Sequence, residues 1–144
     1  MKKILVLLLG ILFLGINLNC SSVPEKNHAL QREWMLVSFG NFSKDLMVKN
    51  KARINLNSKI EDGKIRGGAF MGCNKMFFTA QFKNNGRIKI SGLGSTMMAC
   101  QDMKLEAAFG RSFERITKYS VEGHFLTLSD DKGMVMKFVA SDWD

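Results

Sequence analysis

Residues that perform acid–base or nucleophilic chemistry are scarce in this chain of 144 residues. Histidine occurs only twice, as His28 and His124, and cysteine only three times. No nucleophile motif accompanies His124, so nothing favours a Ser-His-Asp or Cys-His site. The acidic residues gather at glycine-containing predicted turns, where solvent explains them better than a catalytic carboxylate pair does. The composition predicts that the protein is not an enzyme.

Cofactor motifs are also absent from the sequence. No glycine-rich phosphate loop follows a strand, and Arg66-Gly-Gly68 is not one. No CxxC or HxxH spacing is present to complete a zinc site. We therefore expect no bound cofactor and no metal.

Long apolar runs are missing as well. The longest, Ile4 to Ile16, has 13 residues and would extend about 20 Å as a helix, whereas a bilayer core is about 30 Å thick. It follows Lys2 and Lys3, and a short apolar run behind positive charges is typical of a signal peptide. We predict that residues 1–19 are such a segment.

The next residues, Asn17-Leu-Asn-Cys20-Ser-Ser, resemble the lipobox of bacterial lipoproteins. That resemblance implies that Cys20 becomes the first mature residue and carries acyl chains, which anchor it to a membrane. The alternative is cleavage by an ordinary signal peptidase. Ser21 after the cysteine, instead of aspartate, resembles outer-membrane sorting. We expect the protein in the bacterial envelope, on the periplasmic side of the outer membrane.

Residues 20–29 are polar, contain the only proline, Pro24, and predict a flexible tether; residues 30–144 form the domain. The net charge of +8 becomes +6 without Lys2 and Lys3, because residues 1–19 hold no acid. The basic residues are scattered, which favours a solvated surface that contacts anionic lipid over nucleic acid. We expect a monomer whose membrane contact is its anchor, and no nucleic-acid partner.

Short runs that alternate apolar and polar residues predict antiparallel strands. Asn85-Gly86 is the strongest hairpin signal, and residues 42–50 are predicted to be a loop. The predicted strands are Glu33–Phe39 and residues 52–57, 64–70, 76–82, 87–91, 119–121, 124–128 and 134–139.

One segment has a helical period instead. Between residues 102 and 118, Leu105, Phe109, Phe113 and Ile116 are spaced by four, four and three residues and so share one face of a helix. Strands, one helix and further strands predict an α+β fold, with the helix packed on a curved antiparallel sheet.

Cys73 and Cys100 permit three interpretations. Met76, Met97, Met98 and Met103 lie nearby in the sequence and would suit a soft-metal site for copper(I). A catalytic redox pair is the second, although the CxxC context that activates a thiol is missing. In an exported chain with Cys20 lipidated, the two remaining cysteines favour the third, a structural disulfide. Its loop of about 28 residues would add roughly 3–4 kcal/mol of stability.

Several of these residues also carry a family resemblance. Trp34, Gly72-Cys73-Asn74, Ser95-Thr96, Met98-Ala99-Cys100 and Glu106 together resemble the META domain, as in HslJ-like bacterial lipoproteins. The resemblance covers about residues 30–141. It implies an antiparallel, partly barrel-like sheet with one helix, and a role in envelope stress without an established catalytic activity. The fold is similar to that of pilotin lipoproteins, which implies an envelope protein or a lipid as ligand.

The leading hypothesis is therefore a non-enzymatic, lipid-anchored META-domain protein that acts in binding or as a stress-response accessory. The alternatives are a periplasmic copper-binding protein with Cys and Met ligands and, with less support, a thiol oxidoreductase. Trp143, near the end of the sequence, fits either a frayed end or an anchor for a partner.

Overall fold

A curled antiparallel sheet dominates the computed structural model, which describes residues 29–143. Within these residues, eight strands follow one another in the order β6-β5-β4-β2-β1-β9-β8-β7, and the short strand β3 pairs with β4. The strands are β1 (Glu33–Phe39), β2 (Arg53–Asn55), β3 (Ile60–Glu61), β4 (Lys64–Phe70), β5 (Lys75–Phe82), β6 (Ile88–Ser95), β7 (Lys118–Glu122), β8 (Phe125–Ser129) and β9 (Val135–Ala140). The helices are α2 (Lys44–Lys49) and α3 (Lys104–Phe113).

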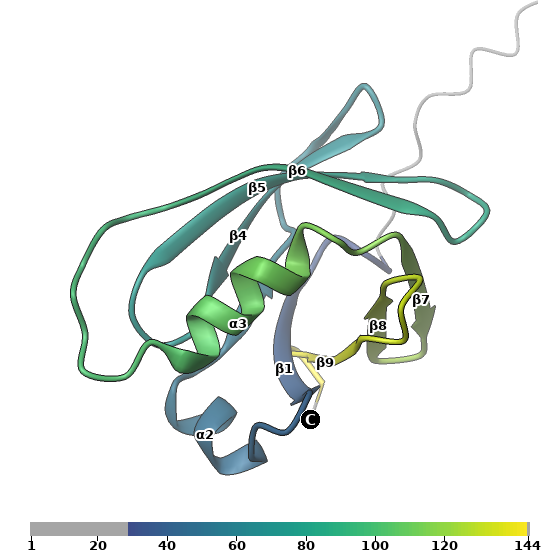
Figure 1. The fold of residues 1–144 in the computed structure, drawn as a ribbon. Coiled ribbons are helices and arrows are strands. Elements are labelled where there is room, and N and C mark those ends of the chain that lie inside the picture. Colours follow the sequence, from purple (N-terminus) through teal and green to yellow (C-terminus); the bar gives the residue numbers. More distant parts are fainter. Residues whose placement is uncertain (1–28, 144) are drawn as a thin grey trace, which may run out of the picture.

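The curl brings the two edge strands together at one end. Arg87, just before β6, bridges Lys118 in β7, and the Tyr119 amide donates to the Gly86 carbonyl at 2.8 Å. From there the two edges diverge, and α3 lies across the concave side of the sheet (Figure 1). The sheet is therefore a half-barrel with the helix over its open side. The predicted α+β class with a partly barrel-like sheet is confirmed.

Aromatic side chains fill the space between α3 and the sheet. Phe109 and Phe113 stack on each other along the helix, with ring centroids 4.6 Å apart. Phe113 also meets the Phe78 ring of β5 edge-on at 4.7 Å. Trp34 of β1 is fully buried, and its indole nitrogen donates to the Leu30 carbonyl at 3.0 Å. The concave side of the half-barrel is thus a packed hydrophobic core.

Alternation identified most strands because each buries only one face. The predicted strands at residues 33–39 and 64–70 have the bounds of β1 and β4. β6 continues to Ser95, four residues beyond the prediction, because its glycines hide the alternation and a bulge shifts its pairing with β5. The two-residue strand β3 is too short to produce a pattern.

The helices correct two predictions. Residues 42–50 are not a loop, because α2 forms there: the Ser43 hydroxyl caps it by accepting the Leu46 amide, and Met47 is buried. Six residues are too few for a helical period to appear. The main helix is also shorter than residues 102–118. Asp102 only accepts the Lys104 amide, and after Phe113 the chain turns so that the Thr117 carbonyl can bond to β6.

Candidate functional site

The residues of the predicted motifs meet where the turn between β4 and β5 faces the start of α3. Cys73 and Cys100 are joined in a disulfide with Cα atoms 6.1 Å apart, which is the pairing that the sequence favours. This bond links the turn after β4 to the segment that precedes α3. It closes a loop between residues 27 apart.

Asn74 is the centre of this cluster, and its side chain is buried. Its Oδ1 accepts two hydrogen bonds, from the Thr96 hydroxyl at 2.8 Å and from the Met98 amide at 2.7 Å. Its Nδ2 donates to the Met98 carbonyl at 3.2 Å and to Glu106 Oε1 at 2.8 Å. All four hydrogen-bonding positions of the amide are therefore used inside the protein.

Glu106 completes the cluster from the first turn of α3. Its side chain is buried, and Oε2 accepts the Asn74 backbone amide at 2.7 Å while Oε1 accepts Nδ2. Two charge-assisted hydrogen bonds hold the carboxylate where the helix N-terminus also favours negative charge. Glu106 thus fastens α3 to the turn that carries the cysteine. We call the set of Cys73, Asn74, Thr96, Cys100 and Glu106 the latch.

Gly72, Met98 and Ala99 serve the latch through the backbone or flank it. Gly72 has a φ of +119°, and a Cβ there would overlap the Asn50 amide, which donates to the Met71 carbonyl at 3.0 Å. Glycine is required on both grounds. Met98 contributes its backbone amide and carbonyl, and its side chain is about half exposed. Ala99 is exposed between Met98 and Cys100.

The functional groups of the latch are engaged with one another. Its cysteines are bonded to each other, its amide is saturated, and both carboxylate oxygens accept hydrogen bonds. Among residues 29–143, no group of three or more His, Cys, Asp or Glu side chains is arranged to hold a metal ion. The arrangement can position the helix and the loop, which is a structural role.

The methionines named for a soft-metal site lie in different surroundings. Met76 is buried in the core, whereas the Met97 side chain is 98% exposed. A buried core methionine and a fully exposed one do not face a common site, which weakens the copper interpretation.

His124 and Trp143 form a separate aromatic group beside β8. Their rings stack at 5.1 Å with planes 8° apart, and Phe125 meets Trp143 edge-on at 5.4 Å. Trp143 therefore packs on β8 and is not a frayed end, although 47% of it remains exposed. His28 and Cys20 lie outside the described residues.

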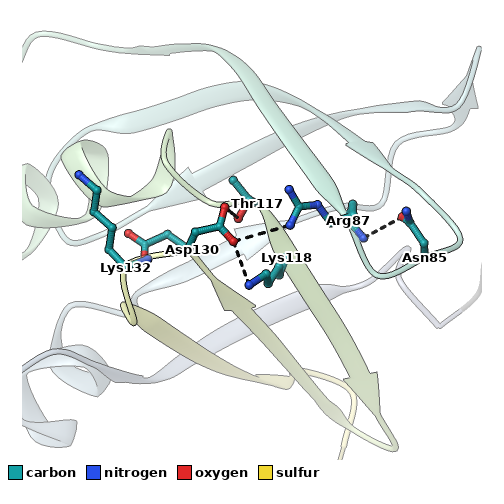
Figure 2. A network of polar contacts seen from close by, with 7 residues as sticks. Asn85, Arg87, Thr117, Lys118, Asp130 and Lys132 are labelled. Atoms are coloured by element: carbon teal, nitrogen blue, oxygen red, sulfur yellow. Dashed lines mark hydrogen bonds and ion pairs between the residues drawn. The ribbon is translucent and has the colours of Figure 1, made fainter.

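A charged network, which the sequence did not reveal, stabilises the contact between the two edges of the half-barrel (Figure 2). The Asp131 carboxylate forms an ion pair with Lys118 Nζ at 2.8 Å and accepts a hydrogen bond from the Thr117 hydroxyl at 3.1 Å. Arg87 forms a longer ion pair with it at 3.6 Å. The hydrogen bond from Lys118 is the largest influence that lowers the pKa of Asp131 below its usual value. At the sequence level these groups appear only as scattered turn residues, because their partners are distant in the chain.

Asp130, beside Asp131, organises the turn before β9. Its Oδ1 accepts the Lys132 amide at 2.8 Å and the Met134 amide at 2.9 Å. The bond from Met134 is the main cause of a lowered pKa, and Arg115, 3.6 Å from Oδ2, adds to it. This aspartate therefore has a structural role at a turn, as the sequence predicts, but it is buried and not solvated as expected.

Comparison with known proteins identifies the family. The profile of the META domain matches residues 28–143. The chain belongs to the META domain family. No curated protein matches the chain. The family resemblance carried by the GCN and MAC motifs is thereby confirmed.

Solved structures share the fold of this META domain at low sequence identity. An NMR structure of a protein from Burkholderia xenovorans is 21% identical, with a TM-score of 0.62, and the match covers 78% of this chain and 83% of that one. A second NMR structure is 19% identical, with a TM-score of 0.58 and coverage of 78% and 92%. A crystal structure of a DUF4847 family protein from Bacteroides vulgatus is 14% identical, with a TM-score of 0.51 and coverage of 81% and 97%.

Proposed function

We propose that this META-domain protein is a lipid-anchored binding protein of the bacterial envelope and is not an enzyme. The observation that carries the proposal is the Cys73–Cys100 disulfide. Disulfides form and persist in oxidising compartments outside the cytoplasm, and they are rare inside it. The bond therefore supports export, the fate that the signal-like residues 1–19 predict.

The latch supports binding over catalysis. Its polar groups hold one another, so they are not available to accept protons from a substrate or to attack it. A thiol oxidoreductase is less well supported, because Cys73 is buried and the CxxC context that activates a thiol is missing, although Cys100 is exposed. A rigid, cross-linked domain suits presentation of a surface to a partner.

Within residues 29–143, the packed core leaves no open space for a ligand between α3 and the sheet. Phe109 and Phe113 occupy the space between α3 and the sheet, so a lipid tail or peptide would have to displace them. Hollows of about 520, 440 and 410 Å³ lie on the outer faces of the sheet. The ligand is therefore sought on the outside of the half-barrel.

The membrane anchor rests on Cys20 in the proposal, since no helix within residues 29–143 is long and apolar enough to cross a bilayer. The test is metabolic labelling with palmitate and fractionation of cells that express the full chain or its Cys20→Ser variant. We expect label and membrane association in the parent protein, and loss of both on Cys20→Ser. The neighbouring variant Ser22→Ala should behave like the parent. Unlabelled parent protein in the soluble fraction would overturn the anchor.

A further inference from the structure

The convex side of β4, β5 and β6 carries an ordered set of side chains that the latch and the core do not use. Strand register aligns these residues in three rows across the strands. The rows are Lys64–Gln81–Lys89, Arg66–Thr79–Ser91 and Gly68–Phe77–Gly94. Their neighbours in each strand, such as Ile65 and Ala80, are buried, so the rows face solvent. We call these nine residues the β4–β6 face.

Phe77 is the one large apolar side chain on this face, and 58% of it is exposed. Gly68 and Gly94 are its partners on the two neighbouring strands. A Cβ at Gly94 would overlap Cε2 and Cζ of the Phe77 ring, so the ring lies over the bare backbone of β6. One side of the ring is thereby supported by the sheet, which leaves an aromatic platform open to solvent.

The rest of the β4–β6 face is basic and hydroxyl-bearing. Lys64, Arg66 and Lys89 are exposed, and none of them forms an ion pair with another residue in the part of the chain that the structure describes. A hollow of about 520 Å³ is lined by Arg66, Thr79 and Ser91, the row next to the one that holds Phe77. Lys59 and Lys64 also line it, together with Glu61 and Asp62. In this lining three cations, Lys59, Lys64 and Arg66, outnumber two anions.

We propose that the β4–β6 face binds an anionic glycan, a sugar chain that bears carboxylate or phosphate groups. A sugar ring has an apolar C–H face, which suits an isolated aromatic platform, and hydroxyl groups at its rim, which suit Thr79, Ser91 and Gln81. The unpaired cations Lys64, Arg66 and Lys89 complement the acidic groups. An acyl chain would instead require a deep apolar cavity. The inference rests on the proposed function, because a protein in the envelope meets such glycans.

The domain without its first 28 residues is the material for the test. The fold stands alone, since the matching part makes up 92% and 97% of two solved chains. Residues 29–143 are titrated calorimetrically with two anionic glycans, polygalacturonate and phosphomannan. Dextran serves as the neutral glycan and polyglutamate as the anionic polymer without sugar. We expect at least one anionic glycan to bind, about tenfold or more tightly than dextran or polyglutamate, and to weaken as salt is raised.

Single substitutions distinguish binding by the Phe77 platform from non-specific attraction by positive charge. Phe77→Ala and Arg66→Ala should each weaken glycan binding about tenfold, a loss typical of one stacking or charged contact. Gly94→Ala retains both Phe77 and Arg66 but forces the Phe77 ring to move, so it should also weaken binding. The matched controls are Phe125→Ala and Lys137→Ala, an exposed aromatic and an exposed lysine on β8 and β9. These should bind like the parent.

Three outcomes would overturn the proposal. They are failure of both anionic glycans to bind, equally tight binding of polyglutamate, and unchanged binding by Phe77→Ala and Gly94→Ala proteins that keep the parental circular dichroism spectrum. The titration uses a chain without Cys20, so its result is independent of the labelling test of the anchor. Failure of one proposal is therefore distinguishable from failure of the other.

Discussion

At the scale of single residues, the buried contact between Asn74 and Glu106 explains why the motif residues occur together. The amide bonds Thr96 and Met98 of the loop on one side and the helix carboxylate on the other. An amide is suited to this position because it donates and accepts at once, and a buried group left without partners would destabilise the fold by about 1–3 kcal/mol. The motif is therefore best described as a joint between loop and helix.

Replacement of Glu106 by glutamine tests this joint. Both carboxylate oxygens accept hydrogen bonds, but glutamine would present an NH2 group to one of the two Asn74 donors. We expect Glu106→Gln to lower the free energy of unfolding by about 1–3 kcal/mol in urea titrations. Glu114→Gln, at an exposed site that caps the same helix, should change it by less than about 0.5 kcal/mol. Equal stability of the two variants would contradict the role of Glu106.

The pKa values of Asp130 and Asp131 predict a dependence of stability on pH. Both are lowered in the folded protein from the ordinary value of 3.8, for Asp130 mainly by the Met134 amide and for Asp131 mainly by Lys118. The ionised forms therefore stabilise the fold. Their contribution is complete above about pH 5 and is lost as the pH falls through 3.8 towards the folded values.

Urea titrations of the parent and of Asp131→Asn at about pH 6 and about pH 3 measure this contribution. The parent should lose more stability than the variant between the two pH values, because asparagine does not titrate. An equal loss in both proteins would show that Asp131 does not contribute.

At the scale of secondary-structure elements, the two adjacent glycines of β4 lie in different surroundings, one against the core and one on the convex surface. A Cβ at Gly67 would overlap the ring of Phe78, which is buried and meets Phe113 edge-on. A Cβ at Gly68, on the convex side, would meet only the Met76 carbonyl oxygen at 3.6 Å, an ordinary contact. Adjacent glycines in one strand thus have different physical reasons to be there.

Alanine at each of these glycines provides a matched pair of variants. Gly67→Ala should destabilise the domain by about 1–3 kcal/mol, since a packed ring has to move. Gly68→Ala should change the free energy of unfolding by less than about 1 kcal/mol, with stabilisation expected if the strand gains from the loss of glycine freedom. Thermal unfolding of both variants measures the difference. Similar midpoints would contradict the close packing of Phe78 against β4.

The elements also show which features a sequence can predict. Strands with one buried face and α3 with its apolar stripe were predicted, because the spacing of apolar residues in the sequence reflects which face of an element is buried. Helix α2 and strand β3 are shorter than the window in which a period is visible. The contact between Asn74 and Glu106 joins residues 32 apart, and the three rows of the β4–β6 face depend on strand register. Single-sequence patterns do not contain either kind of information.

At the scale of the whole molecule, two sets of polar contacts connect distant parts of the curled sheet and its helix. The latch ties α3 to the turn between β4 and β5, and the charged network around Asp131 connects Arg87, just before β6, with Lys118 of β7 (Figures 1 and 2). Between them the core is packed. The exposed aromatic and basic groups of the β4–β6 face are then presented on a rigid frame, as binding requires.

The oxidation state of Cys73 and Cys100 in the cell tests the central claim most directly. The protein is alkylated with iodoacetamide in freshly lysed native cells, without reductant, digested and analysed by mass spectrometry. The account predicts a cross-linked peptide pair that contains both cysteines, with neither alkylated. Two freely alkylated cysteines in the native compartment would contradict both the disulfide and the export of this META domain.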